Sequence, residues 1–88
     1  MKSDLLLTLQ IVARLETMGV LGAADLCVWF GLSVATLKRR LADARHLGAV
    51  IESSRAESGA WVYRLCNPRA VRERLYQWLE LESARSLV

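Results

Sequence analysis

Four glycines divide the first 48 residues of the chain into short segments, and this division limits what the chain can form. They are Gly19, Gly22, Gly31 and Gly48. Glycine often follows the last residue of a helix because it adopts the left-handed backbone conformation at little cost. The segments between them predict a first helix from Asp4 to about Met18, capped by Ser3, and a second helix from Ala23 to Phe30. A short extended link at Val20-Leu21 joins the two.

A third helix is predicted immediately after the second. Gly31 ends the eight-residue apolar helix, and Ser33 is a good N-cap for a helix from Val34 to about Leu47. The two helices are therefore separated by three residues only, which predicts a compact helix-turn-helix between Ala23 and Gly48.

The first helix carries more apolar surface than one face can hold. One stripe at helical spacing is formed by Leu5, Leu9, Val12 and Leu15. Leu6 and Leu7 lie outside this stripe, so we expect the helix to be buried on more than one side. Since 53% of the 88 residues are hydrophobic, we also expect some apolar surface to meet another subunit.

The periodicity changes after Gly48. Residues 49–53 read as a strand, and the alternation in residues 61–65 places Trp61, Tyr63 and Leu65 on one face of a second strand. The polar stretch 54–60 between them contains Gly59, which favours a turn. The pattern predicts a β-hairpin.

A last helix begins at Asn67-Pro68, a favourable pair of N-cap and first helical residue, and runs to about Arg85. Its packing stripe consists of Val71, Leu75, Trp78 and Leu79. The predicted fold class is α+β, mainly α: a three-helix core and a hairpin in residues 1–66, followed by a C-terminal helix in residues 67–88 for dimerisation or packing.

The positive charge of the chain is concentrated in the third helix. The whole chain has a net charge of +3, and residues 33–48 alone sum to the same value. At about 100° per residue, Leu37, Leu41 and Ala44 form a buried stripe. The opposite face carries Ala35, Lys38, Arg39, Ala42 and His46.

This combination of long cationic and small side chains suits a helix in the major groove of DNA. The small residues let the helix backbone approach the base edges, and the cations reach base edges or phosphates. The alternative is an ordinary solvated face of an amphipathic helix. Hydroxyls at the helix N-terminus suit phosphate oxygens, and a hairpin arginine suits the DNA backbone. The candidate DNA-binding residues are Ser33, Ala35, Thr36, Lys38, Arg39, Ala42, Arg45 and Arg55.

The same stretch resembles the DeoR-type (type-11) winged helix-turn-helix of bacterial WYL-domain regulators and biotin repressors. The matching pieces are Ala24-Asp25-Leu26, Gly31-Leu32-Ser33, Thr36-Leu37-Lys38-Arg39-Arg40-Leu41, Leu47-Gly48-Ala49-Val50-Ile51-Glu52 and Tyr63-Arg64-Leu65. The resemblance implies a winged-helix fold and a small sequence-specific DNA-binding regulator, expected to be a cytoplasmic repressor of a bacterial or phage promoter. The segment Cys27-Val28-Trp29 is more apolar than in the family, and no effector domain follows, so no small-molecule ligand or cofactor is implied.

We expect a homodimer on a palindromic operator, because one winged helix on one half-site buries little surface. The candidate dimer residues are Leu6, Leu7, Leu75, Trp78 and Leu79. The alternative for Trp78 is packing on the core of its own chain.

Other classes of function find less support. The chain shows no nucleophile–base pair and no glycine-rich phosphate loop, so no enzyme is expected. Cys27, His46 and Cys66 lack the spacing of a zinc site, and free thiols are expected. A membrane span over residues 17–37 has suitable length but contains Asp25 and several glycines.

The rival from another class is a winged-helix protein-interaction module, an assembly or anti-defence factor. It would use three tryptophans as anchors: Trp29, Trp61 and Trp78.

Overall fold

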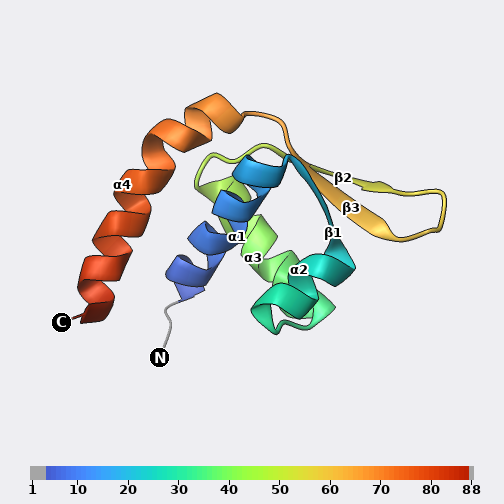
Figure 1. The fold of residues 1–88 in the computed structure, drawn as a ribbon, viewed down its shortest axis with the longest axis horizontal. Helices are drawn as coiled ribbons and strands as arrows, with labels where there is room; N and C mark the ends of the chain where they lie inside the picture. Colours follow the sequence, from blue (N-terminus) through green and yellow to red (C-terminus); the bar gives the residue numbers. More distant parts are fainter. Residues whose placement is uncertain (1–3, 88) are drawn as a thin grey trace.

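The computed structural model describes residues 4–87, without the side chains of residues 82, 83 and 85–87. The elements follow in the order α1 (Asp4–Met18), β1 (Val20–Gly22), α2 (Ala23–Phe30), α3 (Val34–His46), β2 (Ile51–Arg55), β3 (Trp61–Leu65) and α4 (Pro68–Leu87). Helices α1, α2 and α3 form the body, the β2–β3 hairpin extends from one side of it, and α4 lies on the other side (Figure 1). The expected α+β, mainly α fold is confirmed.

The break between α2 and α3 is made by the two residues that the sequence indicates. Gly31 has a φ of 64°, and the N–H of Leu32 closes the end of α2 by donating to the carbonyl of Cys27 at 2.9 Å. Ser33 caps α3, since its Oγ accepts a hydrogen bond of 3.2 Å from the N–H of Thr36. The expected cap Ser3 of α1 lies outside the described residues.

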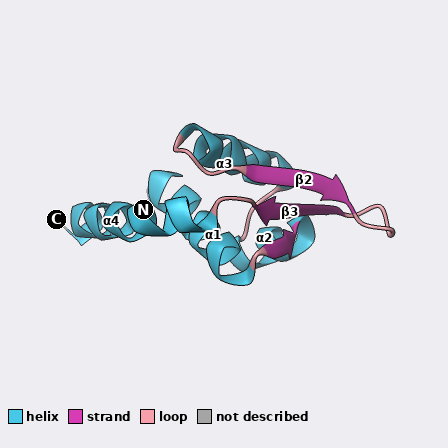
Figure 2. Cartoon of the chain, turned by 90° about the horizontal axis from the view of Figure 1, so that it is seen from above, coloured by secondary structure: helices cyan, strands magenta, loops and turns pink. Residues whose placement is uncertain are grey.

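The sheet has three strands rather than the predicted two. β1 pairs with β3, and β3 pairs with β2, both antiparallel, so that Leu21 and Ser53 lie on either side of Tyr63. The segment Val20–Gly22, which we expected to be a link, is therefore the edge strand β1. Figure 2 shows β3 between β1 and β2, with α3 above the hairpin.

Strand β2 begins two residues later than predicted, at Ile51 rather than Ala49. The reason is that the backbone before it has other partners. The N–H of Ala49 donates to the carbonyl of Ala44 at the end of α3, and the N–H of Val50 donates to the side-chain oxygen of Asn67 at 2.8 Å. Asn67 also donates from Nδ2 to the carbonyl of Gly48 at 2.9 Å, so its side chain joins the α3–β2 link rather than capping α4.

The core lies where α1 meets α3, α4 and the inner end of the sheet. Leu37, Leu41 and Ala44 of α3 are buried, as the helical spacing predicts. In α1 the stripe is displaced, because Leu5 is exposed whereas Leu6 is buried. This helix contacts both α3 and α4, so the arc that it buries is wider than one stripe and shifted away from Leu5.

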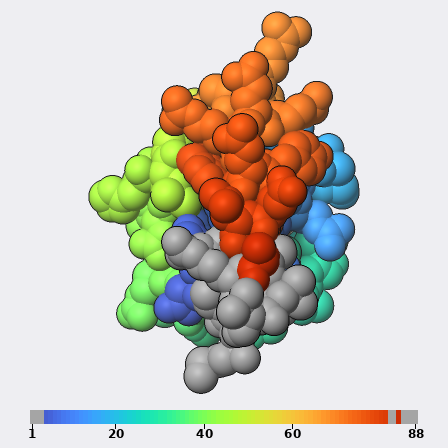
Figure 3. All heavy atoms as spheres, turned by 90° about the vertical axis from the view of Figure 1, so that its left-hand side faces the viewer, coloured from blue at the N-terminus to red at the C-terminus, as the bar shows by residue number. Residues whose placement is uncertain are grey.

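Helix α4 packs against α1 through the stripe expected for it. Val71 and Leu75 belong to the core, and Trp78 and Leu79 pack partly buried against it. Figure 3 looks onto this side, where α4 lies across the molecule between α3 and the end of α1. Among the described helices, none is both long enough and apolar enough to cross a membrane.

Candidate nucleic-acid interface

The outward face of α3 is formed by the residues that the sequence places there. Ala35, Lys38, Arg39, Ala42 and His46 are all exposed. Within residues 4–87, neither Lys38 nor Arg39 makes an ion pair or a side-chain hydrogen bond. Two cations and two alanines therefore face solvent on the first three turns of the helix.

The hydroxyls at the start of α3 are already used in the cap. Ser33 accepts from the N–H of Thr36 and donates from Oγ to Thr36 Oγ1 at 3.0 Å. Ser33 is exposed and Thr36 is half-buried. The Thr36 hydroxyl thus keeps its own O–H group, which can donate a hydrogen bond to a phosphate oxygen.

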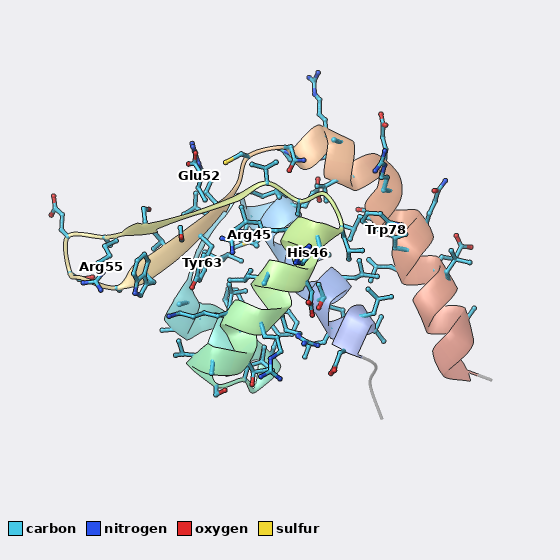
Figure 4. All side chains as sticks on the ribbon, turned by 180° about the vertical axis from the view of Figure 1, so that it is seen from behind. Arg45, His46, Glu52, Arg55, Tyr63 and Trp78 are labelled. Carbon is cyan, nitrogen blue, oxygen red and sulfur yellow. The ribbon has the colours of Figure 1, made fainter. Side chains whose placement is uncertain are left out.

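The other two cations of α3 have partners within the chain. Arg40 is only 6% exposed, and its guanidinium lies 3.3 Å from a carboxylate oxygen of Asp4 and 3.1 Å from one of Asp43. Arg45 donates from Nε and Nη2 to the carbonyl of Ile51, at 3.2 and 3.0 Å. Figure 4 shows Arg45 reaching from α3 toward the hairpin. Arg40 therefore fixes α3 to the start of α1, and Arg45 fixes it to the start of β2.

The two faces of the hairpin differ in charge. Arg55 and Trp61 are opposite each other in the ladder, and the Arg55 guanidinium lies 4.8 Å from the centroid of the Trp61 ring. On the opposite face, Arg64 and Glu52 form an ion pair of 2.7 Å. Glu52 points away from the side that carries Arg55 and Tyr63 (Figure 4). The face turned toward α3 is thus basic, whereas the other is neutralised.

A concavity of about 280 Å³ lies between α3 and this basic face of the hairpin. Leu41 and Tyr63 are the buried residues among those around it. Burial raises the pKa of the Tyr63 hydroxyl above its usual value, and the positive charge of Arg45 acts against this rise. The lining contains no carboxylate and consists of Lys38, Leu41, Arg45, Ser53, Trp61 and Tyr63.

Four of these lining residues are not among the candidate DNA-binding residues: Leu41, Ser53, Trp61 and Tyr63. The sequence places Leu41 in the buried stripe and offers Trp61 only as a protein-interaction anchor. The alternation in β3 does place Trp61 and Tyr63 on one face, but it suggests a core face for both. Tyr63 is indeed buried, whereas Trp61 is 38% exposed because the hairpin extends beyond the helical body. The alternation predicts the face but not how far along the strand the core continues.

The candidate dimer residues are covered to different degrees by their own chain. Leu6 and Leu75 belong to the buried interior, and Leu7, Trp78 and Leu79 pack half-buried against the core. Among the described side chains of α4, the large apolar ones that are exposed are Tyr76 and Leu81.

The cysteines and the histidine form no metal site among the described residues, where no group of three or more potential ligands occurs. Cys27 and Cys66 are free thiols, half-buried and exposed respectively.

Neither a protein-family model nor a curated protein matches the chain. Among solved structures, the chain is similar to a MarR-family transcriptional regulator from Silicibacter pomeroyi, with a TM-score of 0.64 and 20% sequence identity. The match covers 96% of this chain and 56% of the other, so the chain spans little more than half of that regulator's length. At this identity the likeness concerns the fold, and kinship with the DeoR type stays a prediction. In fold, the chain is a winged helix-turn-helix with the β2–β3 hairpin as its wing.

Proposed function

We propose that the chain is a sequence-specific double-stranded DNA-binding transcriptional regulator, acting as a repressor of a bacterial or phage promoter in the cytoplasm. The observation that carries this proposal is the outward face of α3. Its two unpaired cations, Lys38 and Arg39, stand between the small side chains of Ala35 and Ala42.

This face suits the major groove, which is about 12 Å wide and admits one α-helix. The alanines allow the helix backbone to approach the base edges. Arg39 and Lys38 supply N–H donors for guanine acceptors or phosphates, and a good bidentate base contact contributes about 1–3 kcal/mol of discrimination. We assign the exposed Arg55 of the hairpin to the DNA backbone beside that groove.

A homodimer on a palindromic operator fits the size of the chain, since one winged helix on one half-site buries little surface. Helix α4, which follows the DNA-binding part after residue 66, supplies the contact surface. Tyr76 and Leu81 are its exposed apolar side chains, with Trp78 and Leu79 beside them at the edge of the core.

The test is selection of DNA fragments from a random pool, followed by affinity measurements at several salt concentrations. The double variant Lys38→Ala/Arg39→Ala should lose about tenfold or more in affinity for the selected sequence. The slope of log affinity against log salt should fall by about 2, one unit for each lost phosphate contact. Arg69→Ala/Arg74→Ala removes the same charge from exposed positions on α4 and is the matched control.

If no sequence is selected, or if the control loses as much affinity as the α3 variant, the proposal is wrong. Equal effects of the two double variants would mean that net charge alone attracts the DNA.

A second candidate function is a protein-interaction module, favoured by the exposed apolar residues of α2. Val28 is exposed, and Trp29 is 46% exposed with the Arg14 guanidinium 5.0 Å from its ring centroid. Of the other two expected anchors, Trp78 is less available to a partner, because it packs on the core. In this case, Trp29→Ala should abolish a complex recovered from lysate, and DNA binding should be non-specific.

A further inference from the structure

The arrangement of α3 and the hairpin restricts the path of any DNA strand bound there. In B-DNA the major and minor grooves alternate, and each is separated from the next by the backbone of one strand. A helix seated in the major groove and a hairpin beside it at the next minor groove must enclose that backbone between them. In this chain, the space between α3 and the hairpin is the concavity of about 280 Å³.

The lining of the concavity is polar on one side and apolar on the other. Lys38 contributes an ammonium group and Ser53 a hydroxyl, both on exposed residues. Trp61 contributes a partly exposed indole ring next to the buried side chains of Leu41 and Tyr63. A nucleotide unit of DNA has the same two parts, an anionic phosphate and a deoxyribose ring whose carbon atoms are apolar.

The charges around the concavity favour an anion. Arg45 lines it and Arg55 lies over Trp61 at its outer edge. Two acidic side chains near the concavity are paired, since Asp43 binds Arg40 and Glu52 binds Arg64 on the far face of the hairpin. An anion in the concavity therefore meets cations and no unpaired carboxylate of the lining.

We propose that this concavity seats one sugar–phosphate unit of the strand that separates the two grooves. Trp61 packs on the deoxyribose, while Lys38 and Ser53 bind the phosphate. Arg45 is a positioning residue, because its two hydrogen bonds to the Ile51 carbonyl hold the hairpin at a fixed distance from α3. The proposal rests on DNA binding as proposed above and adds a defined place for one phosphate.

The test replaces single phosphates of the selected operator by uncharged methylphosphonates, one position at a time. Substitution at one or two adjacent phosphates of each half-site should weaken binding of the wild-type protein by about five- to tenfold. These phosphates should lie between the groove read by α3 and the next groove. In Ser53→Ala and Lys38→Ala the loss at those positions should shrink to less than twofold, because the contact is already missing.

A second measurement addresses the sugar contact. Trp61→Ala should weaken binding by about tenfold, because the apolar contact with the sugar is lost, whereas Trp61→Phe should retain most of the affinity. Trp29→Ala removes a partly exposed tryptophan away from the concavity and should leave the affinity unchanged. Thermal unfolding of each variant shows whether the fold is retained, and Ser53→Ala, on an exposed strand position, tests the phosphate contact independently of Trp61.

The results separate the two proposals. If no DNA sequence is selected at all, the proposed function fails. The proposed sugar–phosphate site is wrong if a sequence is selected but no methylphosphonate between the grooves weakens binding, or if Trp61→Ala binds as tightly as Trp29→Ala. DNA recognition by α3 would then still stand.

Discussion

The positively charged side chains of α3 form two pairs with different purposes. Arg40 is buried between two aspartates, and Arg45 holds the start of β2. Lys38 and Arg39 have no partner among the described residues. Two of these four side chains thus hold the fold together. The net charge of the helix therefore overstates the positive charge that is available to a ligand.

The largest effect expected from this comparison is the loss of stability in Arg40→Ala. The guanidinium is buried, whereas the side chains of Asp4 and Asp43 are 87% and 48% exposed, so both carboxylates regain further water when the arginine is removed. We expect the free energy of unfolding to fall by about 1–2 kcal/mol, mostly through lost packing of the buried stem. Urea denaturation measures this quantity.

Two variants serve as controls for Arg40→Ala. Arg40→Met keeps most of the buried stem and should lose clearly less stability. Lys38→Ala, on the exposed side, should stay within about 0.5 kcal/mol of the wild type. If Lys38→Ala and Arg40→Ala lost the same free energy of unfolding, the distinction between paired and unpaired cations of α3 would be wrong.

A smaller effect is expected for Arg45→Ala, which removes the link between α3 and the hairpin. Two hydrogen bonds to one half-buried carbonyl are lost, so we expect about 1 kcal/mol less stability. The operator affinity should also fall, and the methylphosphonate profile should broaden because the hairpin is less firmly held. Unchanged stability together with a normal profile would show that Arg45 does not position the hairpin.

The smallest effect concerns Tyr63 and appears only in alkali. Burial raises the pKa of its hydroxyl above 10, so the folded state holds the proton more tightly than the unfolded chain. The resulting stability is fully present below pH 10 and is lost as the pH rises through the raised pKa. In a Tyr76→Phe background, tyrosinate absorbance should therefore report a titration above pH 10, and Arg45→Ala should move it higher still. A midpoint at or below 10 would contradict this assignment.

The sequence predicts the helices well because their ends are set by local chemistry. Gly31 and Ser33 mark the turn between α2 and α3 by the conformations and hydrogen bonds that those residue types favour. The sheet is predicted less well. β1 is a strand only because β3 lies beside it, and β2 starts late because Asn67 takes up the N–H of Val50.

The candidate interface is likewise predictable where it depends on local sequence and not where it depends on distant residues. The outward face of α3 follows from helical periodicity, which needs only the positions of Leu37 and Leu41 as a reference. That Arg40 is buried does not follow, because its partner Asp4 is far away in the sequence. The contribution of Trp61 to the concavity depends on how far the hairpin extends beyond the core, which a strand pattern does not contain.

The pairing of β1 with β3 bears on how the protein is made and how it folds. Leu21 in β1 is buried opposite Tyr63, more than forty residues later in the chain. A nascent chain that has been synthesised only to the end of α3 therefore has all its helix-turn-helix residues but lacks the strand that fixes the connection between α1 and α2. The native arrangement of α3 and the hairpin therefore depends on residues up to the end of β3, because β3 is needed to pair with β1.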